Sequence, residues 1–180
     1  MSSVNINDKI KSVHALSVNT VYEPKYAIDN NPDRHWAIGP QHAGNGYRVG
    51  YSIRFLELTD INKIEIIISE EYQIPERIDV YASLRDVYVG QTTWTVDALE
   101  DTYLVKSIQP NNRHIIISFT RQNIQNLHLQ IVPSQYGYIS INEICLYNET
   151  ASETIKDDVK NIILNNNLIQ KYIIPFEREE

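Results

Sequence analysis

The sequence predicts an all-β protein, namely an antiparallel jelly-roll β-sandwich of about eight strands followed by a C-terminal helical appendage. Hydrophobic and polar residues alternate from about Tyr51 to Tyr147, as in strands with one buried face. The apolar runs are short and are separated by turn chemistry, for example in the segment 109–112, Gln-Pro-Asn-Asn. No helical pattern lies between them, which favours a sandwich over βαβ units.

The alternation also predicts which side chains face the interior. Runs with this pattern begin near Ile64, Ile78, Ile115 and Leu127, and they are rich in β-branched residues. Polar residues such as Glu65 occupy the intervening positions. The predicted inward-facing residues are Ile64, Ile66, Ile78, Val80, Ile117, Leu129 and Ile141.

The last predicted strand changes phase in its middle. Ile139 and Ile141 share one parity, whereas Ile144 and Leu146 share the other, with Glu143 at the switch. A parity change within a strand is the sequence trace of a β-bulge, which redirects a side chain and often lies beside a site. Partial burial of both faces of the strand is the alternative explanation.

After Asn148 the pattern becomes helical, so we divide the chain into a β domain, 1–148, and a helix with an acidic tail, 149–180. Hydrophobic residues follow steps of four and three, and Pro175 is expected to end the helix. The predicted seam consists of Ile155, Val159, Ile162, Asn166, Ile169 and Ile173. Its spacing is close to a heptad, which favours an intermolecular contact over packing on the chain's own sandwich.

Composition restricts the partners. The net charge of -7 argues against a nucleic-acid ligand, which requires a basic face. The first residues lack the pattern of a secretory signal, and no apolar run reaches the ~20 residues of a membrane span. The lone Cys145 cannot form an internal disulfide. We therefore expect a soluble chain without a signal peptide, located in the cytoplasm or in a virion, and no membrane insertion.

Three segments occur in an order and at separations that identify a family resemblance. Segment 26–36, Tyr-Ala-Ile-Asp-Asn-Asn-Pro-Asp-Arg-His-Trp, is similar to A-x-D-G-N-x-x-T-x-W. Segment 137–147 is similar to a closing strand ending in E-I-x-(V/L)-Y, and segment 78–83 to a strand ending in Ser. Together they resemble discoidin domains, also called coagulation-factor type C domains, which are galactose-binding-like jelly rolls. The likeness covers about Ser12 to Asn148.

The resemblance implies a structural cation, usually calcium, held by the first segment and the closing strand. Asp29 and Glu143 stand where the family has its acidic ligands. Arg34 stands where the family usually has Thr, so a hydroxyl ligand is lost and a positive charge is added. Two possibilities stay open: a backbone carbonyl alone contributes at this position, or the guanidinium replaces the cation by pairing with Asp29. Trp36 is expected in the core, its alternative role being a stacking platform for a sugar.

Catalytic patterns are absent from the sequence, and we do not expect an enzyme. The five His are scattered, and none has metal-ligand spacing with Cys or with a second His. Cys145 lies in an apolar strand, which favours a buried small hydrophobe over a nucleophile. The acidic pair Glu70-Glu71 is interpreted as part of a solvated loop.

The leading hypothesis is therefore a non-catalytic module that recognises carbohydrate. In the family that this chain resembles, ligands approach the loops at the end of the sandwich near the cation. That end is expected to carry Tyr22, His35, His42, Arg48 and Tyr136. Aromatic faces and Arg or His donors suit a sugar, which offers one apolar face and a rim of hydroxyls.

The alternative is a structural or assembly protein in which the same fold binds protein. Examples would be a virion component, such as a phage tail or capsid decoration, or a scaffold subunit of a larger complex. The predicted helical seam and the absence of a signal and of a disulfide favour this hypothesis. In that case the chain would form an oligomer, or join a larger assembly, through its C-terminal helix.

Overall fold

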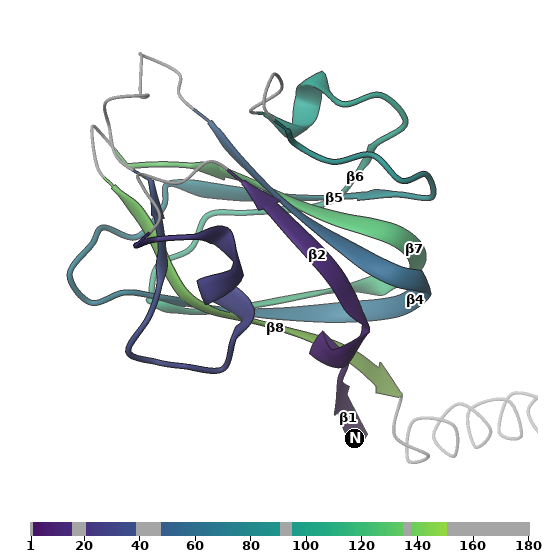
Figure 1. Ribbon diagram of the computed structural model, residues 1–180, viewed down its shortest axis with the longest axis horizontal. Coiled ribbons are helices and arrows are strands. Elements are labelled where there is room, and N and C mark those ends of the chain that lie inside the picture. Colours follow the sequence, from purple (N-terminus) through teal and green to yellow (C-terminus); the bar gives the residue numbers. More distant parts are fainter. Residues whose placement is uncertain (1, 16–20, 39–47, 91–94, 135–137, 151–180) are drawn as a thin grey trace, which may run out of the picture. The chain divides into compact units, whose positions relative to one another are not determined.

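The computed structural model describes residues 2–15, 21–38, 48–90, 95–134 and 138–150. The chain divides into two compact units, Val4–Asn148, and Met1–Ser3 together with Glu149–Glu180. Eight strands and three 3-10 turns are described (Figure 1). In chain order they are β1 (Ser2–Asn5), η1 (Asn7–Lys9), β2 (Ile10–Ala15), η2 (Pro24–Ile28), β3 (Trp36–Ile38), β4 (Val49–Ile68), β5 (Arg77–Ser83), η4 (Val96–Ala98), β6 (Tyr103–Ile108), β7 (His114–Val132) and β8 (Ile139–Thr150).

Two long strands, β4 and β7, run through both layers of a sandwich (Figure 1). The first half of β4 pairs with β2 and with the second half of β7, and β5 and β6 complete this layer. The second half of β4 pairs with β8 and with the first half of β7, and β3 continues that layer beside β8. All of these pairs are antiparallel, so the predicted sandwich of about eight strands is confirmed.

A bulge marks the place where β4 passes from one layer to the other. Arg54 pairs with Asn126 and Thr59 with Ile124, so four residues of β4 face a single residue of β7. That single residue, Gln125, donates a hydrogen bond from Nε2 to the carbonyl of Phe55 (2.7 Å). Extra residues on one strand bend it, and this bend closes the two layers over the core.

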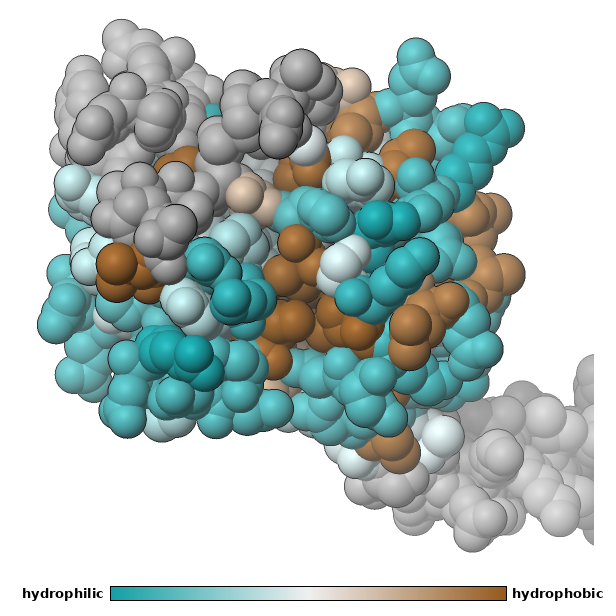
Figure 2. Space-filling model, in the orientation of Figure 1, coloured by the Kyte–Doolittle hydropathy of each residue, from teal (hydrophilic) through white to brown (hydrophobic). Residues whose placement is uncertain are grey.

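The core lies between the two layers. All seven residues predicted to face inward are buried, which confirms the period-two interpretation. Trp36 is also fully buried, and its ring centroid lies 4.9 Å from that of Tyr51, so its predicted place in the core is confirmed. On the face drawn in Figure 2, hydrophobic residues lie near the centre and at the right edge among hydrophilic ones, as is usual for a protein surface.

The predicted bulge in the last strand is also confirmed. Ile67 of β4 pairs with Glu143, whereas the next residue, Ile68, pairs with Ile141. Asn142 is therefore the extra residue of β8, and it accounts for the change in side-chain parity. The bulge lies beside the turn that contains Asp29, because the Nδ2 of Asn142 donates to the carbonyl of Pro32 (3.1 Å).

The β5–β6 connection covers polar side chains on the outer face of β7. Asn126, His128 and Gln130 are fully buried there, although a half-exposed strand would carry such residues on its solvent side. Asn126 Nδ2 donates to the carbonyl of Arg85 (2.6 Å), and Gln130 Oε1 accepts the N–H of Val96 (3.0 Å). These side chains therefore hold the connection against the sheet.

The predicted helix and its seam, from Ile155 to Ile173, lie outside the described residues, and their role in assembly stays a prediction. Within the described part of the chain, the only helical elements are the three short 3-10 turns. No helix found there is long and apolar enough to cross a membrane.

Candidate functional site

Strand ends from both layers meet at one end of the sandwich. The strand registers place the start of β4 beside the end of β7, and the end of β3 beside the start of β8. The β4–β5 connection leaves Ile68, which pairs with Ile141 near the start of β8. Because consecutive strands cross between layers here, side chains from distant parts of the sequence come together at this end.

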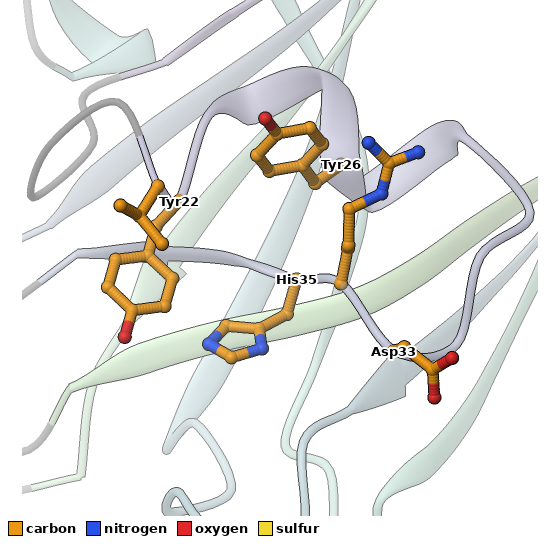
Figure 3. A pocket seen from close by; sticks show the side chains of 6 residues that line it. Tyr22, Tyr26, Asp33 and His35 are labelled. Atoms are coloured by element: carbon orange, nitrogen blue, oxygen red, sulfur yellow. The ribbon is translucent and has the colours of Figure 1, made fainter.

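An open pocket of about 410 Å³ lies beside the segment that precedes β3 (Figure 3). Figure 3 shows the rings of Tyr22, Tyr26 and His35 around the hollow, with the carboxylate of Asp33 at the far side. The lining residues are Val21, Tyr22, Tyr26, Asp33, Arg34 and His35. The pocket thus combines aromatic surface with hydrogen-bonding groups of both charges.

Two successive Asx turns shape the wall of the pocket. Oδ1 of Asp29 accepts the N–H of Asn31 (2.9 Å), and Oδ1 of Asn31 accepts the N–H of Asp33 (3.1 Å). Asn30 adopts a left-handed conformation with φ of 56°, which Asn tolerates better than most residues. Local sequence chemistry therefore determines the course of the chain up to Arg34.

An aromatic row extends from the pocket across neighbouring elements. The rings of Tyr22 and His35 stack with centroids 4.9 Å apart. His35 then contacts Tyr72 (5.7 Å), and Tyr72 contacts Tyr138 (5.8 Å). We refer to Tyr22, His35, Tyr72 and Tyr138 as the aromatic row. Three separate segments supply it: the segment before β3, the β4–β5 connection and the residue directly before β8.

The structure brings together two of the five residues predicted to bind ligand. Tyr22 and His35 line the same pocket and touch each other. Arg48 instead forms an ion pair with Asp97, its Nη1 lying 2.9 Å from Oδ2. His42 and Tyr136 lie outside the described residues, and their predicted role stays a prediction.

Sequence reasoning missed Tyr72 and Tyr138. Tyr72 follows Glu70-Glu71 in a segment that was interpreted only as a solvated loop. Tyr138 lies two residues after Tyr136, which was selected from the same connection. The sequence feature that could have identified them is a tyrosine in each of two connections, which the topology of the sandwich brings to the same end.

The two carboxylates predicted to hold a cation lie close together. The backbone N–H of Asn30 donates to Glu143, which ties the turn to the bulge of β8. Burial, and secondarily the charge of Asp29, raise the pKa of Glu143 to about 7, although the N–H groups of Asn30 and Ile144 oppose this rise. Nη2 of Arg34 lies 2.8 Å from Oδ2 of Asp29. Calcium at this place stays a prediction, with the guanidinium as the competing occupant.

Nothing in the described residues suggests a reactive centre elsewhere. Within that part of the chain, no group of three or more His, Cys, Asp or Glu residues is arranged to hold a metal ion. Cys145 is half-buried, and burial raises the pKa of its thiol, so the reactive thiolate is disfavoured. The polar cluster around this thiol, which includes Tyr147 and Glu65, is a hydrogen-bonded outer face of β4 and β8.

Comparison with known proteins shows the fold. No family model and no curated protein sequence matches the chain. Among solved structures, the CBM32-1 and CBM32-2 domains of Clostridium perfringens ZmpB in complex with GalNAc match with 21% identity and a TM-score of 0.66, over 81% of this chain and 36% of that chain. This chain therefore spans about a third of that structure.

Two single modules match over nearly their full length. The family 32 carbohydrate-binding module of C. perfringens NanJ, in complex with galactose, has 15% identity and a TM-score of 0.65, over 82% of this chain and 100% of that one. The chitosan-binding module 1 of a chitosanase/glucanase from Paenibacillus sp. IK-5 has 13% identity and a TM-score of 0.57, over 77% and 95%. The chain therefore shares the jelly-roll β-sandwich fold of these modules.

Proposed function

We propose that this chain is a non-catalytic carbohydrate-binding module and that its ligand enters the pocket beside Tyr22, Tyr26 and His35. The observation that carries the proposal is the pocket itself, in which aromatic rings lie beside an arginine and a carboxylate. Binding sites for small ligands are typically concave, with apolar walls and a few convergent polar groups. The fold supports the same conclusion, because the structural neighbours are named for binding sugars.

The chemistry of the pocket suits a sugar ring. A pyranose offers an apolar face of C–H groups, which packs on an aromatic ring, and hydroxyls around its rim. Arg34 donates only, the carboxylate of Asp33 accepts only, and a hydroxyl can satisfy both. The pocket carries both charges, which favours a neutral sugar over a strongly anionic one.

The aromatic row extends the pocket for a longer glycan. Tyr138 is 39% exposed, and it is linked to the pocket through Tyr72 and His35. A second sugar unit bound in the pocket's neighbourhood would meet these rings. The structural neighbours are named for GalNAc, galactose and chitosan, which differ in their substituents. A panel of different neutral glycans is therefore the appropriate test for the sugar that this pocket binds.

A glycan array tests the proposal, followed by calorimetry with the strongest ligand. We expect the wild-type chain to bind at least one neutral glycan and Tyr22→Ala to lose most of that binding. Tyr103→Ala is the matched control, because Tyr103 is an exposed tyrosine on β6 outside the lining of the pocket. Absence of any glycan ligand for the folded wild type would refute the function, and equal losses in both variants would refute the site.

A further inference from the structure

The turn from Asp29 to Arg34 wraps around the bulge of β8 and brings two carboxylates together. Asn142, the extra residue of the bulge, donates to the carbonyl of Pro32, and the N–H of Asn30 donates to Glu143. These contacts hold Asp29 near Glu143, close enough for their charges to interact. Two negative groups held in one place repel each other, and a positive partner beside them relieves this repulsion.

Both carboxylates have an oxygen in need of a positive partner. Oδ2 of Asp29 and Oε1 of Glu143 are buried, and neither has an aligned hydrogen-bond donor among the described residues. A buried charged oxygen without a partner is costly, because it has lost its water and gained nothing in return. The place therefore favours a cation, whether this is a metal ion or a side chain.

Arg34 already brings a cation to this place. Its Nη2 lies 2.8 Å from Oδ2 of Asp29, a close ion pair even though the N–H does not point along the hydrogen-bond direction. Its guanidinium carbon also lies 4.7 Å from the centroid of the Tyr26 ring. A guanidinium over an aromatic face is stabilised by the ring and is always protonated. Two independent contacts thus hold the charge beside Asp29.

We propose that the guanidinium of Arg34 takes the place of the divalent cation that the family resemblance implies, so that this turn is stable without bound metal. A calcium ion requires six to eight oxygen ligands at about 2.3–2.6 Å. On Oδ2 of Asp29 it would stand next to a permanent positive charge and would lack the hydroxyl ligand that Thr supplies in the family. The residues present therefore fit an arginine better than they fit calcium.

The pocket wall depends on the same side chain. Arg34 lines the pocket together with Tyr26 and Asp33, which lie on the turn or directly beside it. If the guanidinium compensates Asp29, the wall keeps its form in the absence of calcium. This inference concerns the stability of the turn, and it does not require that the pocket bind a sugar.

Thermal unfolding of the full chain, first in excess chelator and then in saturating calcium, tests the proposal. A ligand that binds only the folded state raises the melting temperature. We expect the wild-type melting temperature to be the same in both conditions, and calorimetric titration with calcium alone to give no binding heat. A higher melting temperature in calcium, or a stoichiometric binding heat, would overturn the proposal.

Arg34→Thr provides the complementary arm, because it removes the guanidinium and restores the hydroxyl. We expect its melting temperature to be lower than that of the wild type in chelator and to recover in calcium. Arg77→Thr is the matched control, since Arg77 forms an ion pair of comparable burial with Asp79 (3.1 Å). The melting temperature of this control variant is expected to be the same in calcium as in chelator, whether or not the substitution lowers it.

Two results for Arg34→Thr would contradict the proposal. These are a melting temperature equal to that of the wild type in chelator, or a loss that calcium does not reverse. If Arg34→Thr does not fold, Arg34→Lys, which retains the charge, replaces it. The proposal is supported if the lysine variant folds and its melting temperature, like that of the wild type, is the same in chelator and in calcium. It is overturned if calcium raises the melting temperature of the lysine variant or of the wild type.

Discussion

The rings of Tyr22 and His35 stack on each other, with centroids 4.9 Å apart and an angle of 27° between their planes. His35 contacts Tyr72 as well, so the histidine joins the pocket to the rest of the aromatic row. Rings that are already packed lose little further freedom when a ligand binds, which favours affinity. The aromatic wall is therefore formed before the proposed ligand arrives.

The contribution of His35 to binding can be measured directly. His35→Ala removes both ring contacts, and we expect glycan affinity to fall about two- to tenfold, the range expected for an aromatic contact. His35→Phe keeps an aromatic ring between Tyr22 and Tyr72 and is expected to lose less. Calorimetry measures both affinities, with unchanged circular dichroism as the control for folding. Equal losses in the two variants would show that the imidazole nitrogens, and not the ring, carry the effect.

Truncation in the core has a predictable cost. Ile66 and Leu129 are fully buried, one on each of the two long strands. Ile66→Ala or Leu129→Ala is expected to lower the free energy of unfolding by about 2–5 kcal/mol. Leu104→Ala is the control, because Leu104 is 55% exposed on β6 and its loss is expected to stay within about 0.5 kcal/mol. Urea denaturation measures all three, and equal values for core and control positions would contradict the assignment of the core.

Protonation of His128 is expected to destabilise the fold in acid. The Nδ1 of this buried ring lies 2.9 Å from Oγ of Ser52, which itself accepts the N–H of Val89. The Ser52 hydroxyl can donate one hydrogen bond and accept two, so it suits either tautomer of a neutral imidazole, and burial favours this neutral form. Burial lowers the pKa of His128 from 6.5 to about 4.

The direction of the pH effect follows from these two pKa values. His128 takes up a proton near pH 6.5 in the unfolded state and only near pH 4 in the folded state. The free energy of unfolding is therefore highest above pH 6.5 and falls progressively as the pH is lowered from 6.5 to about 4. The total loss is on the order of 3 kcal/mol. The raised pKa of Glu143 acts in the opposite direction between about pH 7 and its ordinary value. We therefore compare the wild type with His128→Gln by urea denaturation across this range, and expect the difference in slope to isolate His128. Parallel pH profiles for the two proteins would contradict the prediction.

The predicted C-terminal seam is tested by a double substitution. If Ile162 and Ile169 form an intermolecular contact, Ile162→Ser with Ile169→Ser is expected to abolish assembly while the β domain stays folded. Analytical ultracentrifugation measures the first property and circular dichroism the second. A wild-type chain that is monomeric at every concentration, or a double variant in which the sandwich unfolds, would count against the assembly hypothesis.

Local pattern was sufficient to predict much of the fold. The alternation around Ile64, Ile78 and Leu129 depends only on the two-residue period of a strand, so it can be recognised without knowing which strands pair. The bulge at Asn142 was visible for the same reason, as a change of parity within one strand. The burial of Trp36 followed from its apolar neighbours and from the motif that contains it.

The polar residues of β7 could not be interpreted in this way. His128 and Gln130 alternate with Leu129 and Ile131, and the pattern places them on the solvent side of the sheet. They are buried because the β5–β6 connection folds back over them. His128 bonds to Ser52, which accepts the N–H of Val89, and Gln130 accepts the N–H of Val96; these hydrogen bonds compensate the loss of water. Such long-range cover leaves no periodic signal in the sequence.

The amino-acid sequence was enough to predict the alternating runs between about Tyr51 and Tyr147, their buried faces and the turn that carries Asp29 and Arg34, and it indicated the bulge. Each of these features depends on neighbours a few residues apart. The aromatic row and the partner of Arg48 depended on how the two layers close. The ring centroids of Tyr72 and Tyr138 lie 5.8 Å apart although the two residues are 66 positions apart in the sequence. Arg48 faces Asp97 because of the path taken by the β5–β6 connection. Contacts of this kind are selected by the packing of the whole sandwich, since many pairings of surface side chains are equally compatible with the local sequence.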